Sequence, residues 1–467
     1  MRYVRNVPRM KKRYALRSSS APIGSYAVGA AVARTGDEMS GPALLLAGFA
    51  ATGSAAAASA LLAGITAAAA VGGPVFGALL DRTPRPGRLL AWALAGYAAA
   101  LVVVLAGLGR LPLPVTVLIA VLAGLVGPAL SGGWTAQLPR VVPKAVLPRA
   151  TALDAMTFNL AGLAGPALAG AVATLYGAPA AVVVAATLVA AALPSAWALP
   201  KARPLDRAAA PAPHGTPEAA SISTAPAVHD AARDARLLAD LAAGFRVIAR
   251  VRPLARATAA SVLSCAGQGV LVACAPLLGE RHLGGAGAGA LLLAVLAASA
   301  LAANALLSRR PDLMGPDALV RYSTLVLAVA LALAATGHPV LLVAATVVAG
   351  IGEGPQLTAL FAIRHRDAPE RLRGQIFTTG ASLKISGFAV GAAAAGPLAL
   401  ASLPGALLAA AALQLLAAAV TVPADGCRSA RRTVRRTRPA PAARTPGTPG
   451  PADRPAPHRN APRPKGH

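Results

Sequence analysis

Aromatic and acidic side chains are scarce in this chain of 467 residues. Only 3% of its residues are aromatic, and 17 acidic residues stand against 44 basic ones, which gives a net charge of +27. Such an excess is typical of nucleic-acid-binding proteins. Those proteins usually interleave basic with aromatic residues, whereas the basic residues here gather in both tails and in alternate loops. We therefore expect no nucleic acid as a partner.

Patterns for metal, disulfide and nucleotide chemistry are also missing. The three cysteines, Cys265, Cys274 and Cys427, show no CxxC spacing, which predicts neither a disulfide nor a zinc site. All seven histidines fall outside the long apolar runs, so we expect no metal centre within the membrane. No phosphate-binding loop of the form GxxxxGK followed by Ser or Thr occurs. ATP hydrolysis is therefore not expected, and no metal or cofactor is predicted.

Apolar sequence is what the chain has in abundance. Hydrophobic residues make up 56% of it and charged residues 13%, and the mean hydropathy is +0.60. In soluble domains about a quarter of the residues are charged, so the composition predicts a polytopic membrane protein.

The basic start leads into a long span that carries charges, not into a short apolar core with a cleavage site. We therefore expect no cleaved signal peptide.

Twelve runs are long enough to cross a membrane, since a spanning helix takes about 20 apolar residues. Six of them precede a polar stretch and six follow it. Backbone polar groups in hydrocarbon must be bonded internally, so each run is interpreted as a helix. The runs cover 23–52, 55–80, 89–108, 114–133, 150–175, 179–199, 254–278, 288–307, 319–335, 340–363, 375–400 and 404–422.

This order divides the chain into five predicted parts. They are a basic cytoplasmic tail (1–22), a six-helix bundle (23–199), a cytoplasmic linker (200–252), a second six-helix bundle (253–422) and a disordered basic tail (423–467). The linker is rich in Ala, Pro, Ser and Thr, which is typical of a segment without its own core. Leu237 to Ile248 is predicted to form a short amphipathic helix within it.

Basic residues alternate between the two ends of the predicted spans. The loops at one end hold Arg82, Arg85, Arg88, Arg140, Lys144, Arg149, Lys201, Arg309, Arg310, Arg364, Arg366, Arg371 and Arg373. The loops at the other end hold only Arg110, Glu280, Arg281, His282 and His338. Because basic loops stay in the cytoplasm, we expect a multi-pass protein of the plasma membrane with both termini cytoplasmic. Trp92, Trp134 and Trp197 would mark the cytoplasmic interface.

The loop between the second and third spans, Gly72 to Arg88 (GGPVFGALLDRTPRPGR), carries a distinctive pattern. Four of its residues match the gating motif between the second and third helices of the major facilitator superfamily: Gly77, Asp81, Arg82 and Arg85. Pro84 and Pro86 depart from that motif. Gly77 would let two helices approach closely, and Asp81 would lie at the positive N-terminus of a neighbouring helix. A plain positive-inside turn is the simpler interpretation of the same residues.

An internal repeat extends the resemblance from Ile23 to Val422. The fifth span contains GLAGPALAG and the eleventh GAAAAGPLAL, each following a charged loop with proline. Duplicated halves joined by a linker are the organisation expected of this superfamily. The resemblance implies an all-α membrane protein with twelve transmembrane helices in two pseudo-symmetric six-helix bundles. It also implies a secondary transporter, without enzyme activity, that binds a small-molecule substrate and is a monomer.

The fifth span resembles that of drug:proton antiporters at Gly165, Pro166 and Gly170. Ala169 stands where those exporters have a further glycine. The resemblance favours export over import. Close helix packing with a proline kink is the alternative interpretation of these residues.

Ionisable side chains inside spans are costly and therefore indicate function. Asp37 and Glu38 lie near the middle of the first span, where removal from water disfavours a charged carboxyl and makes proton exchange possible. We select Asp37 as the cavity-facing residue, because the Arg-x-Gly-Asp pattern resembles the first helices of exporters in the superfamily. Arg34 is three residues away, which allows an ion pair on one helix face. That pair would be the structural alternative to proton coupling.

Three further ionisable residues lie inside predicted spans. Glu353 in GIGEGPQ is expected to serve proton coupling or to recognise a cationic substrate, beside glycines and a proline that would loosen the helix. Alternatively, Glu353 pairs with Lys384 of the eleventh span. Asp154, nearer the cytoplasmic end of the fifth span, is interpreted as a gate or helix-end contact. Arg34, Asp154 and Lys384 are the possible charge partners within the spans.

These residues favour a proton-coupled exporter of a small organic compound, driven by the proton gradient and working by alternating access. A proton-coupled importer and an uncoupled facilitator are the alternatives. A membrane-embedded enzyme would need paired carboxylates or a histidine cluster at a membrane face, and the placement of the histidines speaks against it. The scarcity of aromatic residues argues against an aromatic-lined substrate pocket.

Overall fold

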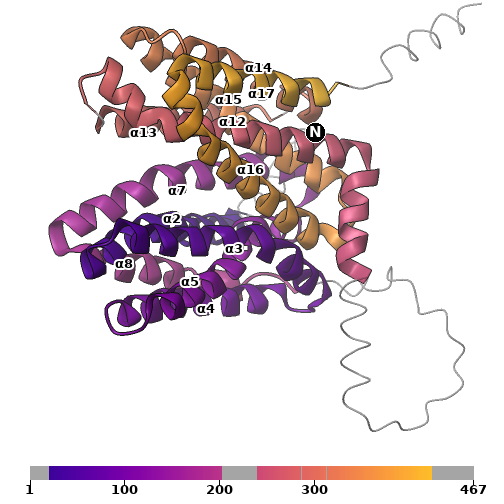
Figure 1. The fold of residues 1–467 in the computed structure, drawn as a ribbon. Coiled ribbons are helices and arrows are strands. Elements are labelled where there is room, and N and C mark those ends of the chain that lie inside the picture. Colours follow the sequence, from indigo (N-terminus) through magenta and orange to yellow (C-terminus); the bar gives the residue numbers. More distant parts are fainter. Residues whose placement is uncertain (1–19, 202–238, 286, 312, 423–467) are drawn as a thin grey trace, which may run out of the picture. The chain divides into compact units, whose positions relative to one another are not determined.

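Helices build the whole of the described structure, and no strand occurs within it. The computed structural model describes residues 20–201, 239–285, 287–311 and 313–422. The predicted basic N-terminal tail up to residue 19, most of the linker and the predicted disordered C-terminal tail lie outside these ranges. Figure 1 shows the helices from α2 to α8 gathered in one bundle and those from α12 to α17 in another.

The first bundle is formed by residues 20–199. Its elements are α2 (Ser20–Thr52), α3 (Ala55–Arg82), α4 (Pro86–Gly107), α5 (Leu113–Pro128), the π-helix η1 (Ala129–Gly133), α6 (Leu138–Val141), the 3-10 helix η2 (Lys144–Val146), α7 (Leu147–Tyr176), α8 (Ala178–Ala191) and α9 (Leu193–Trp197). The sixth predicted span is thus interrupted between α8 and α9, where Pro194 follows the break and cannot continue the backbone hydrogen bonding.

The second bundle begins at residue 252. Its elements are α12 (Arg252–His282), α13 (Gly287–Arg309), α14 (Pro316–Ala334), α15 (Pro339–Asp367), the 3-10 helix η3 (Glu370–Leu372), α16 (Arg373–Ala401) and α17 (Leu403–Val420). Residues 239–250 form a further helix, close to the predicted amphipathic segment. Ile248 of that helix is buried, and Asp240 forms an ion pair with Arg82 at 2.7 Å.

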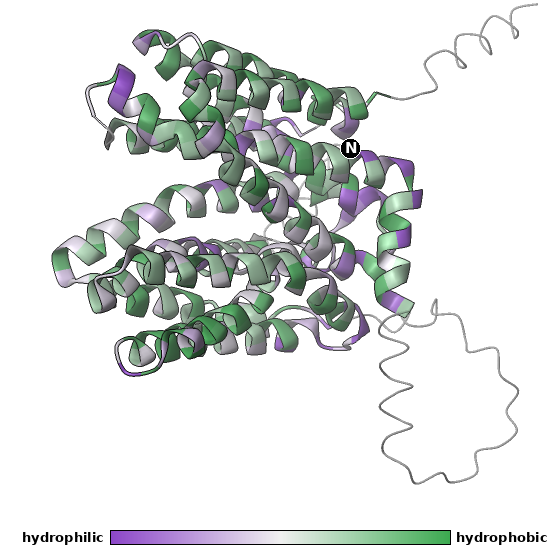
Figure 2. Ribbon diagram, viewed as in Figure 1, coloured by the Kyte–Doolittle hydropathy of each residue, from purple (hydrophilic) through white to green (hydrophobic). Residues whose placement is uncertain are grey.

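The number of membrane helices agrees with the prediction of twelve. Eleven helices in the described ranges are long and apolar enough to span a membrane. The twelfth is α2, whose 33 residues exceed the length required but include Arg34, Asp37 and Glu38. Figure 2 shows hydrophobic residues along most of the helices, with hydrophilic ones gathered toward the end where residues 239–250 lie.

Proline and glycine set several helix boundaries. Pro86 and Pro339 occupy the first turn of α4 and α15, where a missing N–H costs nothing. Gly177 ends α7 at φ 89° and Gly337 precedes α15 at φ 70°, a backbone conformation that other residues rarely adopt. These positions explain why the sequence predicted most helix ends closely.

Small residues allow the helices to approach at backbone distance. A Cβ atom added to Gly72 of α3 would lie 1.9 Å from the carbonyl oxygen of Leu125, and one added to Gly124 of α5 would lie 2.0 Å from that of Ile65. The same arrangement recurs in the second bundle, where Gly391 of α16 meets the carbonyl of Ala266. Helices in lipid gain little from the hydrophobic effect when they associate, so van der Waals packing has to hold them together. Close backbone contact at glycine provides that packing here in place of aromatic side chains.

Each bundle has its own buried core, and several helix pairs join the bundles. In the first bundle, one cluster of buried residues lies between Tyr26 and Leu199. In the second bundle, clusters of buried residues lie between Ile248 and Ala417. The largest contacts between the bundles are α3 with α16 and α7 with α13. The segments around Lys144, Pro316 and Glu370 lie together at one end of the molecule. We call this end the basic end.

Two expectations about membrane helices are wrong. Trp134 is fully buried and lies beside Tyr26, with ring centroids 6.0 Å apart, so only Trp92 and Trp197 are exposed as interfacial rings would be. The helix around Glu353 is not loosened, since α15 runs unbroken from Pro339 to Asp367. Its glycines serve packing instead, because a Cβ at Gly354 would lie 2.4 Å from the carbonyl oxygen of Ala300.

The glycine contacts predict a clear difference between two alanine variants. Gly72→Ala forces a methyl group against the Leu125 carbonyl and should lower the free energy of unfolding by about 1–3 kcal/mol, the usual cost of overpacking. Gly96→Ala, where nothing lies within 4 Å of the added atom, should leave it unchanged or slightly higher. Thermal unfolding of both variants in detergent tests this, and equal stabilities would contradict the packing argument.

Candidate functional site

Asp37 and Glu38 lie halfway along α2 and point to different surroundings. Asp37 is half-buried, and its Oδ1 accepts a hydrogen bond of 2.8 Å from the hydroxyl of Tyr97 on α4. Glu38 is exposed and lies where α2 passes closest to α7. Successive helix residues differ in direction by about 100°. Glu38 is therefore the more accessible of the two carboxyls, while Asp37 is held by the first bundle.

Glu353 and Lys384 lie near the middle of α15 and α16. Both side chains are half-buried, and neither forms an ion pair in the part of the chain that the structure describes. The positive charge of Lys384 interacts electrostatically with Glu353 and also with Glu38 across the boundary between the bundles. The structure thus brings one cation near two of the three candidate carboxyls.

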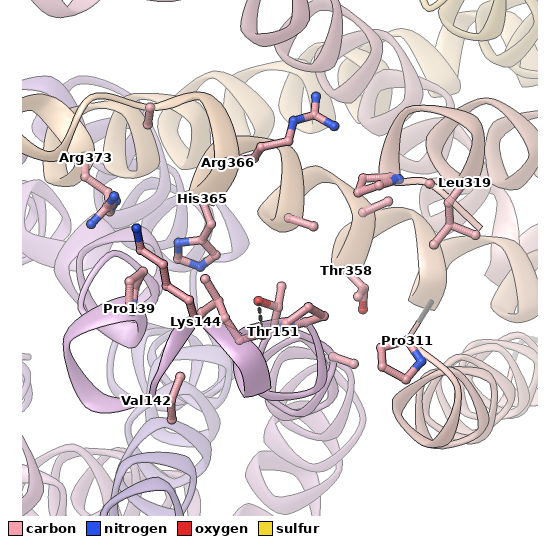
Figure 3. Close-up of a pocket in the computed structure, with 18 of the residues that line it drawn as sticks. Pro139, Val142, Lys144, Thr151, Pro311, Leu319, Thr358, His365, Arg366 and Arg373 are labelled. Atoms are coloured by element: carbon pink, nitrogen blue, oxygen red, sulfur yellow. Dashed lines mark hydrogen bonds between the residues drawn. The ribbon is translucent and has the colours of Figure 1, made fainter. Parts of the chain in front are cut away.

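A cavity of about 900 Å³ lies at the basic end, away from these carboxyls (Figure 3). Its walls come from the loop before α7, from the segment between α13 and α14, and from the residues around η3. None of the candidate coupling residues lines it. The cavity is therefore a feature separate from the central charges.

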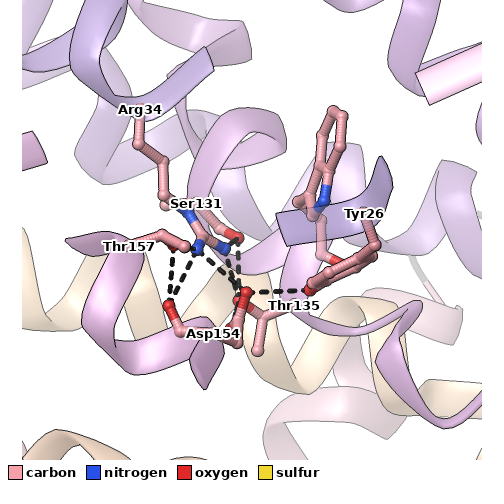
Figure 4. A network of polar contacts seen from close by, with 7 residues as sticks. Tyr26, Arg34, Ser131, Thr135, Asp154 and Thr157 are labelled. Atoms are coloured by element: carbon pink, nitrogen blue, oxygen red, sulfur yellow. Dashed lines mark hydrogen bonds and ion pairs between the residues drawn. The ribbon is translucent and has the colours of Figure 1, made fainter. Parts of the chain in front are cut away.

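Arg34 and Asp154 form a buried ion pair between α2 and α7 (Figure 4). The distance from Arg34 Nη1 to Asp154 Oδ1 is 2.9 Å, and both side chains are almost completely buried. Asp154 Oδ1 also accepts from the Tyr26 hydroxyl at 2.9 Å, and its Oδ2 accepts from Thr135 at 2.8 Å. Arg34 donates further to Thr135 at 2.8 Å and to Thr157.

This network changes two expectations drawn from the sequence. Arg34 pairs with Asp154 of another helix rather than with Asp37, which leaves Asp37 to Tyr97. Asp154 is a buried ion-pair partner rather than a helix-end contact, because α7 begins at Leu147 and places it two turns inside. Tyr26, Thr135 and Tyr97 were not predicted. The two tyrosines could have been found from the sequence, because each lies within an apolar run and a buried Tyr usually forms a hydrogen bond through its hydroxyl.

Three phenylalanines pack together between the central charges and the basic end. Phe158 of α7 lies 5.4 Å from Phe361 of α15, and Phe361 lies 5.9 Å from Phe377 of α16, measured between ring centroids. The guanidinium carbon of Arg34 lies 3.7 Å from the Phe158 ring centroid. Phe361 follows Glu353 by eight residues, or about 12 Å of helix. The cluster therefore joins both bundles on the basic-end side of Glu353.

The predicted gating motif lies against α16. Asp81 accepts hydrogen bonds from the backbone amides of Gly374 at 2.7 Å and Gln375 at 2.8 Å, which are at the N-terminus of that helix. There the carboxylate meets unpaired amides and the positive end of the helix dipole. A Cβ at Gly77 would lie 2.4 Å from Gln375 Cα. Arg82 binds Asp240 as described, and Arg85 is exposed at the start of α4.

The residues of the fifth-span motif differ in their surroundings. Gly165 contacts the backbone of α2 at Glu38, since a Cβ there would lie 2.9 Å from the carbonyl carbon of Glu38. Pro166 is exposed within α7, and a Cβ at Gly170 would meet nothing within 4 Å. Close packing thus applies to Gly165 and not to Gly170. Gly165 brings α7 next to the residue pair Asp37 and Glu38.

The buried ion pair predicts a large loss of stability when one partner is neutralised. Asp154→Asn leaves the Arg34 guanidinium uncompensated and should cost about 3–5 kcal/mol, as for other buried pairs. Asp240→Asn removes an exposed partner of Arg82 and should cost less than about 1 kcal/mol. Thermal unfolding of the two purified variants makes the comparison, and a similar small effect for both would refute a structural role for the Arg34–Asp154 pair.

The bonds of Asp81 predict that its neutral variant loosens the basic end. Asp81→Asn loses charge-assisted hydrogen bonds to α16, which are worth about 1.5–3 kcal/mol together with the dipole interaction. Spin labels at Ala145 and Arg371, both exposed, would report the separation of the bundles in a cysteine-free background. We expect a longer-distance population in the variant. An unchanged distance distribution would show that Asp81 does not hold this end closed.

Known proteins share this fold at low sequence identity. The structure of the human organic anion transporter MFSD10 (TETRAN) matches with 18% identity and a TM-score of 0.67, over 86% of this chain and 99% of that one. A bacterial homologue of the iron transporter ferroportin matches with 16% identity and a TM-score of 0.65, over 86% and 98%. The proton:xylose symporter XylE matches with 13% identity and a TM-score of 0.62, over 86% and 95%.

Sequence comparison gives the family. No curated protein matches the chain by sequence. The family model described as Major Facilitator Superfamily matches residues 26–384, which is most of the chain. The chain therefore belongs to the Major Facilitator Superfamily, and it is a secondary transporter that works by alternating access and not an enzyme.

Proposed function

We propose that the protein is a proton-coupled antiporter that exports a small organic compound across the plasma membrane. One observation carries the proposal. Three carboxyl side chains, Asp37, Glu38 and Glu353, lie near the middle of spanning helices, and none forms an ion pair within the described residues. Carboxyls in such positions are costly and are retained where they handle protons or charged substrates.

Lys384 links protonation to the arrangement of the bundles. It belongs to α16, and its charge acts on Glu38 of α2 as well as on Glu353. An ionised Glu38 attracts Lys384 across the boundary between the bundles, and a protonated Glu38 does not. Proton uptake therefore changes the energy of bringing the two bundles together, which is what coupling requires.

The closed basic end gives the order of steps. With the phenylalanine cluster packed and Asp81 bound to α16, protons reach Glu38 from the opposite side. Opening of the basic end would then expose the same carboxyls to the other compartment. If the basic loops are cytoplasmic, as the positive-inside bias predicts, protons enter the cell while the substrate leaves it.

Resemblance supports the direction of transport. Gly165 and Pro166 resemble the fifth-helix motif of drug:proton antiporters, and Gly165 brings α7 against Glu38. Among the matched structures, XylE is a proton:xylose symporter and MFSD10 an organic anion transporter. These two proteins support a small organic substrate and a proton as partner ion on this fold. The substrate site is expected to be mainly aliphatic, because few aromatic residues are available.

Proton movement in proteoliposomes tests the proposal. Wild-type protein with an imposed pH gradient would be screened against lipophilic cations, antibiotics and metabolites while an enclosed dye reports pH. We expect a substrate to dissipate the gradient through wild-type protein, and Asp37→Asn, Glu38→Gln or Glu353→Gln to reduce this by at least about tenfold. Glu280→Gln, at the exposed end of α12, is the matched control and should behave like wild type.

The result also separates the alternatives. Wild-type proton movement in all three carboxyl variants would contradict the proposal. Downhill flux of a substrate without any proton movement would identify an uncoupled facilitator. Substrate accumulation in the direction of proton flow would identify an importer.

A further inference from the structure

The cavity at the basic end is built from both bundles and is strongly basic. One wall consists of α6, η2 and the start of α7, and the other of the segment between α13 and α14 together with η3 and its flanks. Four basic side chains and one acidic side chain line it: Arg140, Lys144, Arg366, Arg373 and Glu370. A volume of about 900 Å³ accommodates an organic ion rather than a few waters.

Some of these cations already have protein partners. Arg366 binds Asp317 at 2.7 Å and Asp367 at 2.8 Å, and Arg140 donates to Gln137 at 2.6 Å. Lys144 forms no ion pair within the described residues, and it is exposed. Its ammonium group is available to a ligand in the cavity.

His365 supplies the second observation. Its side chain is 7% exposed, yet both ring nitrogens have no hydrogen-bond partner in the described structure. The ring lies 4.6 Å from that of Phe377, which holds it in place. Figure 3 shows His365 facing the cavity beside Lys144, with Arg373 nearby. A buried polar group without a partner is costly, so a partner in the cavity is expected.

We propose that this cavity binds a phosphate-bearing anion through Lys144 and His365, either the headgroup of an anionic phospholipid or a soluble phosphate compound. Lys144 provides the charge, and the imidazole provides an N–H donor in a partly dehydrated site. Charge-assisted hydrogen bonds to phosphate oxygens are the strong kind. The guanidinium groups of Arg366 and Arg373 strengthen the positive field around the site without having to change their partners.

Such a ligand would act on the conformation of the protein. The cavity walls come from α7 on one side and α15 on the other, so an anion that contacts both holds the basic end closed. A ligand shifts an equilibrium by its difference in affinity for the two states. The anion is thus a regulator of the opening step, separate from the central carboxyls and from the transported compound.

Two binding experiments on the full chain distinguish the sources. In the first, inorganic pyrophosphate is titrated onto protein in phosphatidylcholine nanodiscs, and thermal unfolding is followed. In the second, protein from nanodiscs with and without phosphatidylglycerol is analysed by native mass spectrometry for retained lipid. We expect saturable binding in at least one arm, weakened about tenfold by Lys144→Gln, as for loss of one charged hydrogen bond.

His365→Phe keeps the ring packing against Phe377 but removes both nitrogens, and it should weaken the same binding. Lys201→Gln is the matched control, because Lys201 is exposed and does not line the cavity. Its affinity should equal that of wild type. Absence of saturable binding in both arms would overturn the proposal and leave the cavity to water. An equal effect of Lys144→Gln and Lys201→Gln would overturn it as well, since the attraction would then be general surface charge.

Discussion

The cost of holding charge between apolar helices governs how this protein is organised. Arg34 and Asp154 meet that cost by forming an ion pair that the hydroxyl groups of Tyr26, Thr135 and Thr157 surround. Because each charge is matched and its hydrogen-bonding capacity largely used, the pair can fix α2 against α7 without serving as a proton site. Because Arg34 pairs with Asp154, it does not form an ion pair with Asp37. Asp37 instead accepts a hydrogen bond from the neutral hydroxyl of Tyr97. The ion pair therefore leaves Asp37 hydrogen-bonded to Tyr97 and outside any ion pair among the described residues.

A second constraint follows from the scarcity of large side chains. With few aromatic residues to fill space, the helices approach through glycine, as at Gly72, Gly124 and Gly391. Three of the seven phenylalanines, Phe158, Phe361 and Phe377, form a cluster where the bundles meet. Backbone contact at glycine thus packs helices within each bundle and, at Gly77, also across the boundary, where the three rings pack as well.

Sequence reasoning predicted the fold well because hydropathy, proline and glycine act locally. The starts of α3, α15 and α17 follow from the apolar runs and from residues such as Pro339. It failed where a residue depends on a partner distant in the chain. Nothing near Arg34 indicates Asp154, 120 residues away. His365 was placed outside a span because its neighbours are basic, although α15 continues past it and buries its ring.

The closed basic end is held by contacts that can be exchanged for water at modest cost. Asp81 binds backbone amides of α16, and both the carboxylate and the amides are readily hydrated when the helices separate. The rings of Phe361 and Phe377, which are almost completely buried, would lose apolar contact as well. Neither contact resembles the fully dehydrated Arg34–Asp154 pair, which would be expensive to break. The Arg34–Asp154 pair lies within the first bundle, whereas the Asp81 bonds lie between the bundles, so that separation at this end leaves the buried ion pair intact.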